Sequence, residues 1–173
     1  MNIYIASSWK NQHAVEMLTV RLRQLGHEVK SFVENNNFEH ERKIPFDEWV
    51  WTAEGAQSFE FDTDAAMNSD LVIYIGPSGC DAWAEVGAAY AAGTTVFGLF
   101  AKGEQIGLMR RMVTWFDRVD EMVEALPTPD IVRTCRGCGC TDDDCHQCIE
   151  KTGEPCHWVE DDLCSTCAAE IQL

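Results

Sequence analysis

The sequence has no long hydrophobic run. No stretch of about 20 apolar residues, the length a helix needs to cross a bilayer, occurs in its 173 residues. The chain opens with Met1-Asn-Ile-Tyr-Ile-Ala6, which is typical of a strand, and lacks the basic and then apolar segments of a secretion signal. We therefore expect no membrane span and a cytoplasmic protein.

Basic residues are scarce. Lys and Arg number 13 against 29 Asp and Glu, and the formal net charge is −16. Such a chain is repelled by phosphate backbones and by anionic lipid, so we expect no direct binding to nucleic acid or membrane. The hydrophobic fraction of 46% is sufficient for a globular core.

Short apolar segments alternate with helical ones over residues 1–126. Strands are predicted at residues 2–6, 28–33, 71–76, 94–100 and 113–116, and helices between them end at Gly26 and Gly93. Such alternation predicts a doubly wound parallel five-stranded α/β sheet of the Rossmann or flavodoxin-like kind. Residues 34–54 are polar with aromatics and are interpreted as a long loop or lid.

The cysteines define a second domain. Residues 127–134, which include Pro127 and Pro129, are interpreted as a linker, and residues 135–173 hold eight of the nine cysteines. Two CxxC pairs enclose four further cysteines: Cys135, Cys138, Cys164 and Cys167 outside, and Cys140, Cys145, Cys148 and Cys156 inside. In a reducing compartment such clustering favours metal over disulfides.

We predict a small zinc-binding domain with two structural ions, because each ion takes four thiolates. The spacing leaves open which cysteines share an ion, His146 and His157 are alternative ligands, and an iron–sulfur cluster is the rival. The segment has too few large apolar residues to fold by burial alone. Its acidic character favours docking to a protein partner or to another subunit.

Glu85 is the most informative single residue. It lies among Ala82, Val86 and other small residues, on a helix that follows a buried strand. Desolvating a carboxylate is costly, and ligands of parallel sheets bind at the carboxyl ends of strands, so a functional role is favoured. The alternatives are a helix-dipole interaction or an ion pair with a distant arginine.

Three separated segments together resemble the nucleoside 2-deoxyribosyltransferase superfamily, which includes nucleotide N-glycoside hydrolases. They are the opening Ile3–Trp9, Asp62 eight positions before Asp70, and the glycine turn and helix from Gly79 through Glu85 to Gly93. The likeness covers about residues 1–126. The Ala-Ser-Ser-Trp opening is similar to a poorly characterised bacterial and phage branch.

The resemblance implies a catalytic set of Glu85, Asp62 and Tyr4. Glu85 would be the nucleophile, because a carboxylate stabilises or bonds to the oxocarbenium-like anomeric carbon of an N-glycoside. Tyr4 would orient Glu85, and Asp62 would contact the sugar hydroxyls or protonate the departing base. Asp64 is the alternative to Asp62 if the helix register differs.

Further residues are candidates for binding a nucleoside or nucleotide. Turn hydroxyls and amides at Ser7, Ser8, Ser78 and Gly79 suit a 5′-phosphate or sugar, and Trp9 and Trp83 suit base stacking. Cys80 is expected to be buried near the site. Family members place an Asn two residues before a Met that here is Met109, but Gly107 occupies the Asn position.

These departures favour hydrolysis over base transfer, since the missing Asn completes a neighbouring subunit's site in the transferases. Gly79 also stands where some members carry an acidic residue. The resemblance further implies a homo-oligomer. Two competing hypotheses are a non-catalytic nucleotide-sensing module coupled to a partner through the zinc tail, and an adaptor whose α/β domain is vestigial.

Overall fold

The computed structural model describes residues 1–35, 44–104, 107–127 and 133–171. The chain divides into two compact units, Met1–Pro127 and Thr128–Leu173. Residues 128–132, most of the predicted linker, lie outside the described residues. None of the helices in the described part of the chain combines the length and apolar character that a bilayer-crossing segment requires.

A parallel sheet forms the centre of the first unit. Its strands, in the spatial order β2-β1-β3-β4-β5, all pair in parallel. The bounds are β1 Asn2–Ala6, β2 Glu28–Ser31, β3 Leu71–Ile75, β4 Thr95–Leu99 and β5 Thr114–Phe116. This is the flavodoxin-like order, so the predicted doubly wound five-stranded sheet is confirmed.

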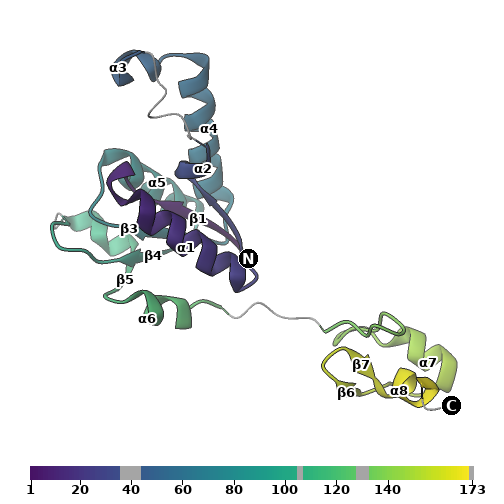
Figure 1. Ribbon diagram of the computed structural model, residues 1–173. Helices are drawn as coiled ribbons and strands as arrows, with labels where there is room; N and C mark the ends of the chain where they lie inside the picture. The colour runs from purple at the N-terminus through teal and green to yellow at the C-terminus, as the bar shows by residue number, and fades with distance from the viewer. Residues whose placement is uncertain (36–43, 105–106, 128–132, 172–173) are drawn as a thin grey trace. The chain divides into compact units, whose positions relative to one another are not determined.

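Helices cover both faces of the sheet (Figure 1). One apolar layer joins the sheet to α1 (Gln12–Gln24) and α6 (Val119–Glu124), and the other joins it to α4 (Ala53–Asn68) and α5 (Cys80–Ala92). Two 3-10 helices, η1 (Trp9–Asn11) and η2 (Leu108–Met112), lie in the connections after β1 and β4.

Strand β1 contributes to both layers. Ile3 and Ile5 belong to the α1 and α6 side, whereas Tyr4 and Ala6 belong to the α4 and α5 side. This alternation follows from the two-residue repeat of a strand, and all four side chains are buried. Tyr4 is thereby directed at the two helices that carry Asp62 and Glu85.

The segment after β2 corrects the predicted strand bounds. The strand ends at Ser31, and Phe32 and Val33 begin the short helix α2 (Phe32–Asn35). Both side chains are buried in one cluster, whereas a continuing strand would direct them to opposite faces. The predicted lid also contains α3 (Phe46–Trp49), and α3 with the start of α4 extends away from the sheet (Figure 1). Its residues 36–43 lie outside the described residues.

The second unit is small and rich in sulfur. Its elements are α7 (His146–Thr152), the antiparallel pair β6 (Trp158–Glu160) and β7 (Leu163–Cys164), and α8 (Ser165–Ile171). Its buried residues in the described part are Leu163 and five cysteines of the predicted set, Cys135, Cys140, Cys148, Cys164 and Cys167. An apolar core of the ordinary kind is therefore lacking in the described part of this unit.

Candidate active site and thiol groups

Tyr4 brings a phenol to the interior of the first unit. Its side chain is fully buried on β1, between β2 and β3. Burial raises the pKa of Tyr4 well above its usual value, and the negative charges of Glu85 and Asp62 raise it further. The hydroxyl therefore stays protonated and is available to donate a hydrogen bond.

Glu85 is the sixth residue of α5, which begins directly after Gly79. Only 8% of the residue is exposed, and its small neighbours let α5 pack closely on the sheet. Burial, and then the charge of Asp62, raise the pKa of Glu85 to about 9, with Tyr4 acting in the opposite direction. No arginine is among the groups that shift this pKa, so the alternative of an arginine-paired Glu85 finds no support.

Asp62 approaches the same point from α4. It is half-buried, and burial is the main cause that raises its pKa to about 6. Asp64, the alternative, is exposed and accepts a hydrogen bond from Asn68 Nδ2 at 2.7 Å. Asp64 lines a separate cavity of about 130 Å³ that includes none of Tyr4, Asp62 and Glu85. The geometry therefore favours Asp62.

The site has buried polar atoms without partners. Among the described residues, eight buried side-chain nitrogen or oxygen atoms lack a hydrogen-bond partner, and four of them belong to predicted site residues. Those four are Tyr4 Oη, Asp62 Oδ1, Ser78 Oγ and Glu85 Oε2. Unpaired buried polar groups are costly and rare, so their concentration here is typical of a site that a polar ligand completes.

The two serines after β1 are already engaged. Ser7 Oγ donates to the Ile75 carbonyl at 2.7 Å and accepts from Asn11 Nδ2 at 3.1 Å. Ser8 Oγ accepts from the Lys10 amide at 3.2 Å and caps η1. Both hydroxyls thus organise the loop, whereas Ser78 Oγ, on the turn before α5, has no hydrogen-bond partner.

Asn11 is a residue that the sequence reasoning missed. Its Nδ2 donates to Ser7 Oγ and also reaches the Ile75 and Pro77 carbonyls at 3.3 and 3.1 Å. The side chain thereby joins the loop after β1 to the loop after β3, the two loops that frame the site. A polar residue at the start of a helix usually indicates a cap. Nothing in the sequence pattern distinguishes a capping Asn from one that joins two loops.

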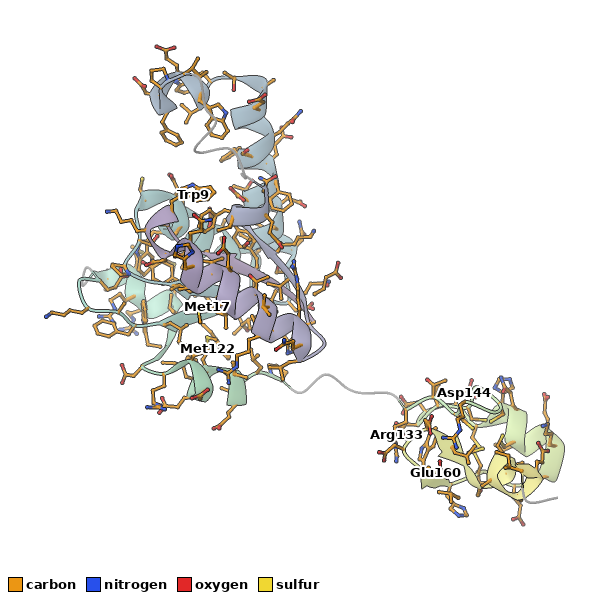
Figure 2. All side chains as sticks on the ribbon, viewed as in Figure 1. Trp9, Met17, Met122, Arg133, Asp144 and Glu160 are labelled. Atoms are coloured by element: carbon orange, nitrogen blue, oxygen red, sulfur yellow. The ribbon has the colours of Figure 1, made fainter. Side chains whose placement is uncertain are left out.

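The predicted stacking tryptophans pack against protein. Trp9, at the start of η1 (Figure 2), meets the Phe32 ring edge-on at 5.1 Å. Trp83 packs on Tyr74 with ring centroids 4.9 Å apart, and its Nε1 donates to Glu104 Oε1 at 3.3 Å. Both rings are only partly buried, so each retains some exposed surface. Met109, on η2, is 58% exposed.

Glu104 is a second buried carboxyl group that the sequence reasoning missed. It follows β4, is 8% exposed, and its Oε2 accepts from Tyr74 Oη at 2.8 Å. Burial, and then Glu104, raise the pKa of Tyr74. Because Glu104 holds groups on both β3 and α5, it fixes the packing of the helix that carries Glu85. The sequence signal that could have identified Glu104 is its position just after a strand, where functional residues of parallel sheets gather.

Cys80 corrects one prediction. It was expected to be buried, but it is exposed at the first position of α5, and its Sγ lies 3.5 Å from Asp81 Oδ1. Cys80 opens the helix, whereas Ala82, two positions later, is the first buried residue of α5.

Eight cysteines of the second unit form two groups that could hold metal ions. The outer group is Cys135, Cys138, Cys164 and Cys167, and the inner group is Cys140, Cys145, Cys148 and Cys156. Within each group the sulfur atoms lie within 4.8 Å of one another. Four converging thiols are the donor set of a tetrahedral thiolate site, so the residues fit zinc. His146 pairs with Asp144 at 2.8 Å and belongs to neither group.

Salt bridges tie the start of the second unit to its hairpin. Arg136 contacts Glu160 and Asp162, and Arg133, labelled in Figure 2, contacts Asp142 at 2.7 Å. The Arg133 guanidinium also lies 4.8 Å from the Trp158 ring centre. These contacts are exposed, so they contribute little to stability, and the thiol groups remain the centre of the unit.

Comparison with known proteins identifies solved structures to which the chain is similar. Neither a family model nor a curated protein matches the chain. A solved 2-deoxyribosyltransferase from Bacillus psychrosaccharolyticus is 26% identical, with a TM-score of 0.57, over 73% of this chain and 93% of that one. A CMP N-glycosidase from Clostridium botulinum is 20% identical, with a TM-score of 0.48, over 72% and 96%. A conserved protein from Enterococcus faecalis is 20% identical, with a TM-score of 0.42, over 64% and 70%.

The likeness to the Bacillus enzyme confirms the resemblance that the sequence predicted. The parallel sheet with its helices defines an α/β protein of the flavodoxin-like class. More narrowly, the chain is similar in sequence and structure to a 2-deoxyribosyltransferase, and it also carries a cysteine-rich unit.

Proposed function

We propose that this protein cleaves the N-glycosidic bond of a nucleoside or nucleotide through Glu85. The observation that carries the proposal is the convergence of three groups from β1, α4 and α5, each with a buried atom that lacks a partner. The likeness to a 2-deoxyribosyltransferase supports the same reaction class, since that enzyme also acts at a glycosidic bond.

The groups have complementary roles in such a cleavage. The Glu85 carboxylate attacks or stabilises the anomeric carbon as its bond to the base breaks, and the base takes a proton from Asp62. Water then attacks the anomeric carbon, releases Glu85 and returns a proton to the site. Tyr4 keeps its proton, because burial and both carboxyl groups oppose its ionisation, and its hydroxyl is the donor available to orient Glu85.

The carboxyl pair shares one proton over much of the pH range. Asp62 has a raised pKa of about 6, and Glu85, acting against the charge of Asp62, has a raised pKa of about 9. Between these values the pair holds one proton, which rests on Glu85 in the free protein and passes to Asp62 before Glu85 acts as a carboxylate. The same arrangement is lost once the pair is fully protonated or fully ionised.

Hydrolysis is preferred to base transfer. Gly107 precedes η2 at the position where the transferases carry the Asn that completes a neighbour's site, and it has no side chain to contribute. Gly79, at the start of α5, likewise replaces an acidic residue of some members, and open space surrounds the place where its Cβ would lie. Water is therefore the more suitable acceptor.

The test is release of free base from a panel of nucleosides, 2′-deoxynucleotides and NAD, followed by chromatography. We expect wild-type protein to release base from at least one class, and an added second base to leave the products unchanged. A new nucleoside containing the added base would instead establish transfer. Binding of a nucleotide by thermal shift, with no base released from any compound, would favour the sensing module.

The pH dependence of kcat/KM should be bell-shaped. Activity is expected to fall below about pH 6, where the pair gains its second proton, and above about pH 9, where it loses its last one. Asp62→Asn removes the charge that helps to raise the pKa of Glu85. The kcat/KM of Asp62→Asn should therefore rise with pH in a single step, with an apparent pKa below 9. A bell that is identical in wild type and Asp62→Asn would contradict the assignment.

We further propose that the second unit binds two structural zinc ions, one in each thiol group. Two separate groups of four converging sulfur atoms suit two single zinc ions better than one iron–sulfur cluster. Gly137 supports the outer group, because a Cβ there would lie 2.7 Å from Cys167 Sγ and would displace it. Element analysis of protein purified without added metal measures the zinc content directly.

A further inference from the structure

The two thiol groups are nested in the chain. The outer group uses the two ends of the unit, Cys135 with Cys138 and Cys164 with Cys167, and all four inner cysteines lie in the segment between them. Closing the outer site therefore requires a loop that already contains the inner one. Ordering the inner site shortens the free chain in that loop, which lowers the entropy cost of closing the outer site.

The groups also touch through Cys148. Its Sγ lies 3.7 Å from Cys138 Sγ and 3.7 Å from Cys164 Sγ, and those two outer sulfur atoms are 3.6 Å apart. An edge of a tetrahedral zinc–thiolate site is about 3.8 Å, given Zn–S bonds of about 2.3 Å. The inner Cys148 thus packs against an edge of the outer site as closely as the outer ligands pack together, and it also contacts Cys140 of its own group at 3.5 Å.

Backbone contacts join the groups as well. The amide of Cys135, an outer ligand, donates to the carbonyl of Cys140, an inner ligand, at 2.8 Å. Cys164 N–H donates to Cys135 Sγ at 3.3 Å within the outer group, and Cys156 N–H donates to Cys145 Sγ at 3.0 Å within the inner one. Displacing the ligands of one group therefore moves backbone that the other group uses.

Apolar contacts in the described part of the unit are few. The buried cluster contains cysteines of both groups and one aliphatic residue, Leu163. With an ion in only one group, the cysteines of the other group would lack zinc–sulfur bonds. Few apolar contacts would then hold that half of the cluster in place. Repulsion between two anionic thiolate centres opposes coupling, but the shared loop, the shared packing and the shared core all favour it.

We propose that the eight thiols load their two ions as one cooperative unit, so that the protein holds two ions or none. This rests on the zinc binding proposed above. Binding of the first ion orders the loop, the Cys148 contact and the backbone that the second ion needs. The second ion is expected to bind at least about tenfold more tightly than the first.

The experiment uses the full chain, reduced and freed of metal, titrated with zinc against a competing chelator and examined by native mass spectrometry. At one equivalent of zinc, metal-free and two-ion forms should dominate. Equal independent sites would instead place about half of the molecules in a one-ion form, and that result overturns the coupling. Absence of any bound zinc overturns the zinc proposal as well, so the two failures are distinct.

Single-ligand variants give a second measurement. Cys145→Ser removes an inner ligand and Cys167→Ser an outer one. Each should weaken zinc binding at the untouched group by about tenfold or more. Cys80→Ser, a change in the first unit outside both groups, is the matched control and should still take up two ions. Full affinity at the outer group in Cys145→Ser would contradict the proposal.

Discussion

Glu85→Gln is expected to abolish base release while making the protein more stable. The amide is nearly the same size and keeps the packing of α5, but it provides no carboxylate for the anomeric carbon. Loss of a group that acts in the transition state lowers kcat by about a thousandfold or more. Substrate binding should survive, because the hydroxyls and amides around the site are unchanged.

The gain in stability follows from the pKa of Glu85. Its pKa is about 9 in the folded protein against 4.5 for the free group, so the folded state binds more protons than the unfolded state between those values. Stability therefore falls as pH rises through this window. Glutamine does not ionise and escapes the loss, which at pH 7 is about 3 kcal/mol. We expect Tm to rise by roughly 10 °C at that pH, and less at pH 5.

Two measurements on the same samples check this result: base release, and thermal unfolding at several pH values. Glu124→Gln, an exposed acid on α6 at the other face of the sheet, is the control and should change neither. Wild-type activity in Glu85→Gln would remove Glu85 from the mechanism. Full loss of activity with a lowered Tm would indicate a structural role for the carboxyl group instead.

Removing metal should unfold the second unit and leave the first intact. The described part of the second unit buries cysteines and one leucine, whereas the first unit has two large apolar layers around its sheet. A strong chelator removes the ions that replace an apolar core, and a zinc-dependent fold is lost with its metal. The first unit contributes no cysteine to either thiol group.

Amide spectra by NMR resolve the two units in one sample. The signals of Gly137, Gly139 and Gly153 should collapse toward unfolded positions on chelation, and those of Gly87 and Gly98 should stay in place. Added zinc should restore the first set. Dispersed second-unit signals in protein shown to be metal-free would mean that the unit folds by other contacts. Movement of both sets would mean that the units depend on each other.

The sequence predicted the sheet, and its family resemblance indicated Tyr4, Asp62 and Glu85 as the candidate catalytic residues. Strand and helix periods, and motif spacing, depend on local features that one chain displays. The end of β2 was missed because Phe32 and Val33 suit a strand as well as a helix, and only their common burial in one cluster separates the two.

Other features depend on contacts between distant segments. Ser7 is engaged by Ile75, which lies 68 positions away, and Glu104 meets Tyr74 across 30 positions. No local pattern encodes such pairings. The exposure of Cys80 is similar, because it depends on which face of the first turn of α5 packs against the rest of the unit. Which cysteines form each thiol group also required the fold, since their spacing allows several partitions.

Strand β1 couples two tasks within five residues. Ile3 and Ile5 fill one layer, while Tyr4 between them faces the carboxyl pair on the other. We expect a change in bulk at either isoleucine to shift the strand and, with it, the phenol. Residues that do not contact the proposed substrate would then affect the rate of the reaction. Laboratory evolution that selects for a higher rate should therefore recover mutations on the side of the sheet opposite the candidate site.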